Sequence, residues 1–376
     1  MMDKVQTLAH IEHNLNHSIF DVKWIPHSAK FVTCGSKTNG NGIIQIYEID
    51  SPKLKLCKEI VRPKSFKCCS FGISSPGERH LAVGDFSGNL YILDLERPEI
   101  PIYEVNAHKD IINSIDAIGG NSNFCGAKEI VTGSRDGSVK IWDPRQKSDP
   151  VACILAKTSP DNNKGDQNNT RDCWAVTFGN SFNSTERTVC SGYDNGDIKL
   201  IDLRNMGVRW ETTSKNGICS LQFDRNDIQM NKLVATTLEG GVYVYDMRTE
   251  HPVKGFSYCC EKNAGQSLGS NGVITGAKST VWCVKHLPQN RDIFVTGGGS
   301  GSIRIWEYKY PEKRFKELSD GSKTGVCGHL EMLCATTISQ QPVHCFDWCP
   351  ERTGLAVCGS FDQTIRVTIT TNLNMN

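Results

Sequence analysis

One pattern of alternating apolar and polar residues recurs along the chain and predicts β-strands. Residues 133–143 combine a turn that contains glycine with the alternating run Ser138–Trp142, and residues 192–202 repeat this arrangement. Alternation with a period of two is typical of a half-buried strand, and a glycine-containing turn before it is typical of a hairpin. We therefore expect a β-hairpin at each copy of the pattern.

The pattern occurs seven times and predicts the fold. Besides the two copies above it fits 84–94, 236–246 and 297–307, and more weakly 42–47 and 359–367. Two further strand-like runs precede each turn, so each copy predicts a four-stranded meander. Because such a sheet cannot bury its faces alone, seven of them should pack around an axis. The chain, residues 1–376, is thus expected to form one all-β domain, a seven-bladed β-propeller.

The two ends of the chain are expected to pair with each other. The last unit stops soon after Thr364–Ile369 and is one strand short, whereas Gln6–Ile11 precedes the first unit without a sheet of its own. A strand from the N-terminus that completes the last blade would close the ring and remove exposed sheet edges. Truncation at either end should then be damaging.

Three polar stretches rich in Gly, Asn and Ser are predicted to be loop insertions without strands: 157–171, 261–278 and 309–329. Most intervals between units exceed the ~40–45 residues that one four-stranded propeller blade needs, and the excess falls in these stretches. We expect them to be solvated connections, and a partner-binding role remains the alternative.

Charge and composition exclude several classes of function. The chain has 42 Lys and Arg against 41 Asp and Glu, a net charge of +1, which argues against a nucleic-acid partner. It has no run of about 18 apolar residues and no apolar stretch of a signal peptide at its start, so we expect a cytoplasmic protein without membrane contact. The 17 cysteines are scattered without matched pairs at ligand spacing, so they predict core residues and no metal site.

No catalytic constellation is visible in the sequence. The glycine-rich stretch Gly297–Ser302 resembles a phosphate-binding loop, but it lacks the Gly-Lys-Ser/Thr ending and the following helix that such a loop needs. We expect a blade turn there, no cofactor, and a protein that is not an enzyme.

The repeated units, together with the dipeptide Trp142-Asp143, resemble the WD-repeat family. In that family a His, a strand Ser or Thr, a turn Asp and a Trp form a buried hydrogen-bonded set. The resemblance assigns these roles to four residues of the third unit: His108, Ser134, Asp136 and Trp142. Thr132 is the other candidate for the strand hydroxyl. Such a set supplies the partners that a buried imidazole and indole need.

A rim of equivalent turn residues is the first candidate binding site. The residue before the turn acid can be aligned in five units: Phe86, Arg135, Asp194, Leu238 and Phe361. Because aromatic residues and Arg dominate the energy of protein interfaces, these residues predict a protein-binding rim. Alternatively, Phe86 and Phe361 fold back onto their own blades.

Several stretches outside the repeat frame resemble one branch of WD-repeat proteins, the dynein axonemal assembly factors. They include 142–146, 171–174, 192–200, 202–206, 230–235 and 286–291. The resemblance covers about residues 8–373 and implies a scaffold of motile-cilium assembly. It implies that RuvB-like ATPase and prefoldin-like co-chaperone subunits, alongside Hsp90, act with such a scaffold on dynein heavy chains. The chain departs from the pattern in residues 261–278, where the loop is longer, and in residues 157–170. We expect a monomer.

A substrate receptor of a cullin-RING ubiquitin ligase is the alternative function. Receptors of that kind within the WD-repeat family dock the ligase adaptor through Trp-Asp-x-Arg boxes. This chain has one such box and two relaxed copies, whose acid and Arg residues are Asp143, Arg145, Asp202, Arg204, Asp246 and Arg248. The other explanation is that each Arg pairs with a neighbouring acid at the blade edge, an interaction worth only ~0–1 kcal/mol.

Overall fold

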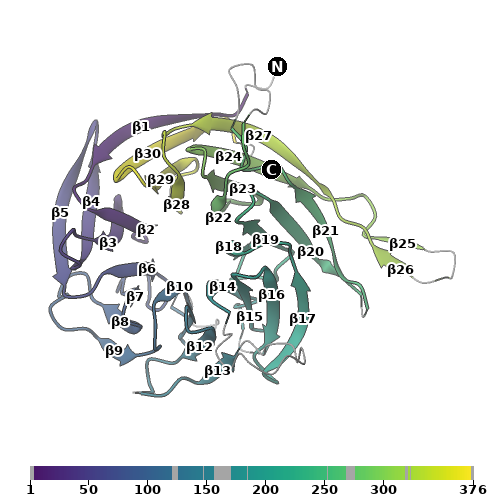
Figure 1. The fold of residues 1–376 in the computed structure, drawn as a ribbon, viewed down its shortest axis with the longest axis horizontal. Helices are drawn as coiled ribbons and strands as arrows, with labels where there is room; N and C mark the ends of the chain where they lie inside the picture. Colours follow the sequence, from purple (N-terminus) through teal and green to yellow (C-terminus); the bar gives the residue numbers. More distant parts are fainter. Residues whose placement is uncertain are drawn as a thin grey trace.

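The computed structural model confirms the seven-bladed β-propeller. It describes residues 4–120, 126–146, 148–155, 171–183, 185–251, 253–267, 276–317, 321 and 323–373. Within these residues the secondary structure is made of strands, and seven four-stranded antiparallel sheets surround a central axis (Figure 1). None of the described segments is a helix of the length and apolarity that crossing a bilayer requires.

The first four blades follow one another along the chain. Blade 1 holds β2 (Ser18–Trp24), β3 (Lys30–Ser36), β4 (Gly42–Asp50) and β5 (Lys53–Arg62). Blade 2 holds β6 (Phe66–Ser70), β7 (Leu81–Asp85), β8 (Asn89–Leu93) and β9 (Tyr103–Asn106). Blade 3 holds β10 (Ile112–Ile118), β11 (Glu129–Ser134), β12 (Ser138–Trp142) and β13 (Ala152–Leu155). Blade 4 holds β14 (Cys173–Gly179), β15 (Thr188–Tyr193), β16 (Asp197–Asp202) and β17 (Gly207–Thr213).

The last three blades complete the ring, and the first strand of each is the innermost. Blade 5 holds β18 (Ile218–Phe223), β19 (Lys232–Thr237), β20 (Val242–His251) and β21 (Gly255–Glu261). Blade 6 holds β22 (Val281–Leu287), β23 (Asn290–Gly298), β24 (Ser302–Lys309) and β27 (His329–Thr337). Blade 7 holds β28 (Val343–Trp348), β29 (Leu355–Ser360), β30 (Thr364–Thr371) and β1 (Gln6–Asn14).

The N-terminal strand completes blade 7, as the sequence predicts. β1 runs antiparallel to β30 from Gln6 opposite Thr371 to Asn14 opposite Thr364. Ile11 faces inward and is 4% exposed, whereas Leu8 faces outward and is 65% exposed. The first and last strands of the chain therefore share one sheet, and pairing between them closes the ring.

The apolar core lies between neighbouring blades. One cluster joins Val32 and Ile44 of blade 1 to Leu81 and Val83 of blade 2, and the other clusters join adjacent blades in the same way. Each sheet thus buries both faces against its two neighbours, which explains the near-continuous burial of second strands such as β15.

The three segments predicted to be loop insertions compare differently with the structure. The prediction of a loop without strands at 309–329 was wrong, because this segment contains a two-stranded sheet of β25 (Phe315–Glu317) and β26 (Lys323–Gly325). In the described part of 261–278, Glu261 is the last residue of β21 and a turn follows at residues 262–265. Nearly all of 157–171 lies outside the described residues.

Candidate functional site

The five predicted rim residues occupy geometrically equivalent positions. In each of these blades the rim residue donates its backbone N–H to the carbonyl oxygen that directly precedes the innermost strand. The five pairs, at 2.9 to 3.0 Å, are Phe86 with Ser65, Arg135 with Ile111, Asp194 with Asp172, Leu238 with Gly217, and Phe361 with Pro342. The turns between second and third strands are thereby tied to the inner strands, so the rim is a fixed surface.

A second ring of residues, which the sequence prediction missed, lies beside this rim. Each innermost strand carries a β-bulge near its start, and a bulge leaves one residue unpaired and re-aims its side chain. The bulged residues are Phe20, Lys67, Asn113, Trp174, Cys219, Trp282 and His344. We call the rim residues and these bulged residues together the turn face. The aromatic residues near blade starts were the only sequence signal for them.

One half of the turn face is aromatic. The ring of Phe361 lies 5.6 Å from Trp282 and 4.7 Å from His344, while Phe86 lies 5.1 Å from Phe20. The contact with Trp282 crosses the boundary between blades 6 and 7, and the contact of Phe86 with Phe20 crosses that between blades 1 and 2, whereas His344 lies in the same blade as Phe361. Phe361 is still 51% exposed. Thus Phe86 folds onto the neighbouring blade, and Phe361 presents an apolar surface to solvent.

The other half of the turn face is acidic. The guanidinium of Arg135 lies 3.8 Å from Asp110 and 3.9 Å from Asp172, and Asp194 approaches the same group of charges. Burial, followed by the negative charge of Asp194, raises the pKa of Asp172 above its usual value. Three carboxylates, those of Asp110, Asp172 and Asp194, thus lie around one guanidinium in this half. Leu238, 40% exposed, borders it on blade 5.

The hydrogen-bonded set of blade 3 is assembled through Thr132 in place of Ser134. The indole Nε1–H of Trp142 donates to Thr132 Oγ1 at 2.9 Å, and Thr132 Oγ1 lies 2.7 Å from His108 Nε2. His108 Nδ1 lies 3.1 Å from the carboxylate of Asp136. Ser134 instead accepts the backbone N–H of Asp136 at 3.1 Å and so supports the turn. The assignment of the strand hydroxyl to Ser134 was therefore wrong.

The protonation of this set follows from its contacts. Burial lowers the pKa of His108, although Asp136 opposes that shift, and this favours the neutral imidazole. Burial opposes ionisation of Asp136, but hydrogen bonds from His108 and Ser138 outweigh it and hold the pKa of that carboxyl well below its usual range. A proton on Nδ1 lets His108 donate to Asp136 and accept from the Thr132 hydroxyl at Nε2, which continues the chain of donors that begins at the Trp142 indole.

The three Trp-Asp-x-Arg-type boxes form local ion pairs. Each Arg binds the Asp two residues before it, at 2.6 Å for Asp143 and Arg145, 2.5 Å for Asp202 and Arg204, and 2.6 Å for Asp246 and Arg248. The first follows β12, the second begins at the last residue of β16, and the third lies within β20, each toward the end of the strand that is opposite the turn face. Arg145 and Arg204 are mostly exposed, whereas Arg248 is 16% exposed because Tyr310 covers it.

Comparison with known proteins assigns the class and then the family. The WD40 model (WD domain, G-beta repeat) matches residues 99–143, 269–307 and 332–368. Together with the seven sheets and the blade 3 set, this match defines a WD-repeat β-propeller. The chain belongs to the dynein axonemal assembly factor 10 (Monad) family, which confirms the resemblance found in the sequence.

The similarity extends over the whole length of these relatives. Dynein axonemal assembly factor 10 of Homo sapiens is 55% identical over 99% of this chain and 98% of the relative. The protein of the same name from Chlamydomonas reinhardtii is 46% identical over 100% and 99%. That from Dictyostelium discoideum is 24% identical over 96% and 94%.

Among the described residues, no three His, Cys, Asp or Glu side chains come together as a group that could hold a metal ion.

Proposed function

We propose that this chain is a non-catalytic protein-interaction scaffold that takes part in the cytoplasmic assembly of axonemal dyneins. The observation that carries the proposal is the similarity over both full lengths to relatives named dynein axonemal assembly factors, from human to a green alga. No cofactor or metal is needed for such a role. The protein acts as a monomer that holds other proteins together.

The turn face is the surface on which we place partner binding. Its aromatic half offers an exposed ring, Phe361, set on Trp282 and His344, and such aromatic anchors supply most of the energy of an interface. Its acidic half, around Asp110 and Asp172, favours a partner that carries positive charge at the matching place. Since backbone hydrogen bonds fix the turns, little conformational entropy is lost on binding.

The partners we propose are those that the family resemblance implies. They are RuvB-like ATPase and prefoldin-like co-chaperone subunits, alongside Hsp90, with dynein heavy chains as the clients. The alternative function, a cullin-RING receptor, rests only on the Trp-Asp-x-Arg-type boxes. Arg145 pairs with Asp143 and Arg204 with Asp202, each within its own box, which matches the simpler explanation of a surface ion pair.

Affinity purification from ciliated cells, followed by mass spectrometry, tests this proposal. The tagged wild type should recover the ATPase and prefoldin-like subunits and dynein heavy chains. A Trp282→Ala/Phe361→Ala variant should lose at least one of these partners, while Val253→Ala, at an 88% exposed residue away from the turn face, should keep them all. Recovery of a cullin and its adaptor, abolished by Arg145→Ala with Arg204→Ala, would instead establish the ligase receptor.

A further inference from the structure

The hairpin of β25 and β26 is an insertion between the third and fourth strands of blade 6. It extends outward from the ring beside blade 5 (Figure 1). β26 lies against β20 of that blade, and a Cβ atom added at Gly325 would come within 2.6 Å of Thr249 Cβ. Only a glycine permits this close approach, so the hairpin is packed tightly onto blade 5 on one side.

A buried polar cluster fixes the base of the hairpin. The hydroxyl of Tyr310 accepts a hydrogen bond from Lys232 Nζ at 2.8 Å, and its ring lies 4.0 Å below the guanidinium of Arg248. Lys232 is fully buried and also binds Asp292 at 2.8 Å. At the other end of the insertion, Gly328 N–H donates to Tyr308 OH at 2.7 Å. Both ends of the insertion are therefore held by blades 5 and 6.

The strand β25 presents an open edge. Val326 N–H donates to Arg314 O at 2.8 Å, so this pair is hydrogen-bonded, and hydrogen-bonded pairs alternate along an antiparallel ladder. The backbone groups of Phe315 and Glu317 therefore point away from β26. All three residues of β25 are exposed, and among the described residues β26 is the one strand that pairs with it. An open, exposed strand edge is a template for pairing with another chain.

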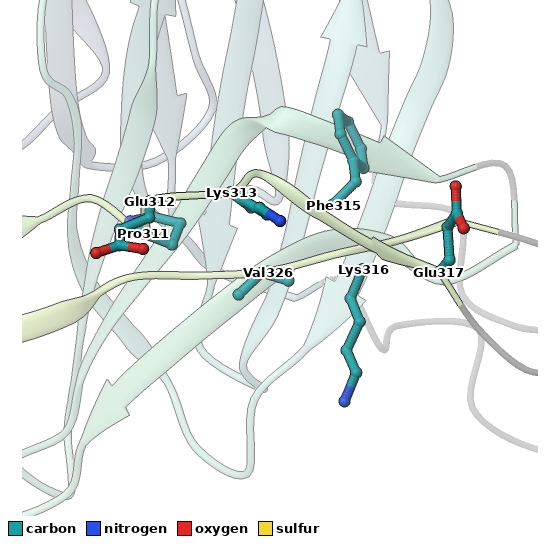
Figure 2. A pocket seen from close by; sticks show the side chains of 7 residues that line it. All are labelled: Pro311, Glu312, Lys313, Phe315, Lys316, Glu317 and Val326. Carbon is teal, nitrogen blue, oxygen red and sulfur yellow. The ribbon is translucent and has the colours of Figure 1, made fainter.

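The side chains around this edge favour an acidic partner with apolar residues. Residues 312–317 and 323–326 carry four basic side chains and two acidic ones. An open hollow of about 750 Å³ at the hairpin is lined by Pro311, Phe315 and Val326 together with charged neighbours. Figure 2 shows Phe315 and Lys316 pointing to opposite sides of the hairpin. One side of an added strand would meet Phe315 and Glu317, and the other would meet Lys316.

We propose that β25 is a docking edge, to which an extended acidic segment of a partner protein adds as a third strand. The added strand would hydrogen-bond to the outward backbone groups of Phe315 and Glu317, as in β-strand addition generally. This surface lies on the outer rim and is separate from the turn face. The inference goes beyond the proposed function and does not depend on it.

Defined peptides test the docking edge on the full chain. The probe is a fluorescein-labelled peptide of seven alternating Glu and Val residues, with a Lys-Val peptide of the same length as its control. Fluorescence anisotropy should show the acidic peptide binding at least ~10-fold more tightly, a preference that salt weakens. Hydrogen exchange should slow at Phe315 and Glu317. Equal binding of the two peptides, protection elsewhere only, or no binding would overturn the proposal.

A matched pair of variants separates strand addition from simple charge attraction. Glu317→Pro removes the outward N–H and should weaken binding of the acidic peptide at least ~10-fold, whereas Glu317→Gln keeps the N–H and should not weaken it. Because proline could also disturb the hairpin, the same acidic peptide with alternate amides N-methylated is tested on the wild type and should fail to bind. Strand addition would be refuted if Glu317→Pro bound the acidic peptide as tightly as Glu317→Gln does and the wild type bound the N-methylated peptide as tightly as the unmodified one. A concentration-dependent dimer abolished by Glu317→Pro would show that a second copy occupies the edge and would also overturn the proposal.

Discussion

Asp347 of blade 7 accepts a hydrogen bond at 2.8 Å from the backbone N–H of Trp24 in blade 1, although the two residues are 323 positions apart. The Trp24 indole N–H also donates to Asp347 O at 3.1 Å. The ring is thus closed twice, by the pairing of β1 with β30 in blade 7 and by this contact between inner strands. At three other boundaries a side chain of an inner strand likewise accepts a hydrogen bond from a backbone N–H of the next blade. The acceptors and donors are Asp21 and Cys69, Asp116 and Phe178, and Gln222 and His286.

Removing the Asp347 carboxylate should weaken ring closure. Asp347→Ala leaves the Trp24 N–H without this acceptor in a buried setting, so the free energy of unfolding should fall by about 1–3 kcal/mol. Glu351→Ala is the matched control, because Glu351 accepts the N–H of His27 at 2.7 Å across the same boundary but at the surface. Urea unfolding should show a loss below ~1 kcal/mol for the control. Equal losses would mean that the inner contact has no special role.

The N-terminal strand should contribute through its inward side chain. Ile11→Ala creates a cavity between blades 7 and 1 and should cost about 2–5 kcal/mol of unfolding free energy. Leu8→Ala, three residues earlier on the outward face, should stay within about 0.5 kcal/mol of the wild type. Deletion of residues 1–11 should expose the edge of β30 and cause aggregation, which light scattering would detect. A soluble monomer with an unchanged Tm would contradict this closure.

Trp142 should be one of the most sensitive core positions. Its side chain is 1% exposed and donates to Thr132, so Trp142→Ala removes both a large apolar volume and a buried hydrogen bond. The expected loss is about 3–5 kcal/mol, measured by chemical denaturation. A loss below ~1 kcal/mol would contradict the burial assigned to it.

Protonation of His108 should destabilise the fold at mildly acidic pH. Because burial lowers its pKa in the folded state, the unfolded chain takes up the proton first as the pH falls. The stability that His108 provides is complete above its unfolded pKa of about 6.5 and is lost as the pH falls through the lower folded value.

The measurement is the change in unfolding free energy between pH 7 and pH 5, in the wild type and in His108→Gln. The pKa values of His17, His286 and His344 are also lowered, that of His344 to about 4, but these residues are common to both proteins. The variant should therefore show a shallower dependence on pH. Identical slopes would show that His108 does not titrate in this way.

The sequence predicted the features that depend on periodicity along one strand. Alternation and turn glycines indicate seven sheets, and the unmatched ends indicate closure by β1. The strand hydroxyl was misassigned because Thr132 and Ser134 are two residues apart and share one face of β11, so only the pairing of β11 with β12 places Thr132 near Trp142. The β25–β26 hairpin was missed because strands of three residues contain too little alternation.

Contacts between blades could not be predicted from spacing alone. The hydrogen bond from the Trp24 N–H to Asp347 depends on how two separate sheets face each other, which the local sequence pattern does not encode. A signal was nevertheless present, since an acid follows an apolar residue within three inner strands, as in Phe20-Asp21, Ile115-Asp116 and Phe346-Asp347. The five rim residues occupy equivalent turns, and protein binding there stays a prediction, while the bulged neighbours of the rim appear only once the inner strands are in register.

The central claim is that the turn face supports dynein assembly, and complementation tests it most directly. Ciliated cells lacking their own relative of this chain would receive the wild type, Trp282→Ala/Phe361→Ala, or Val253→Ala, expressed at equal levels. The account predicts that cytoplasmic axonemal dynein heavy chains return with the wild type and with Val253→Ala, and remain depleted with the double variant although its Tm stays near that of the wild type. Full recovery of heavy chains by a folded double variant would contradict it.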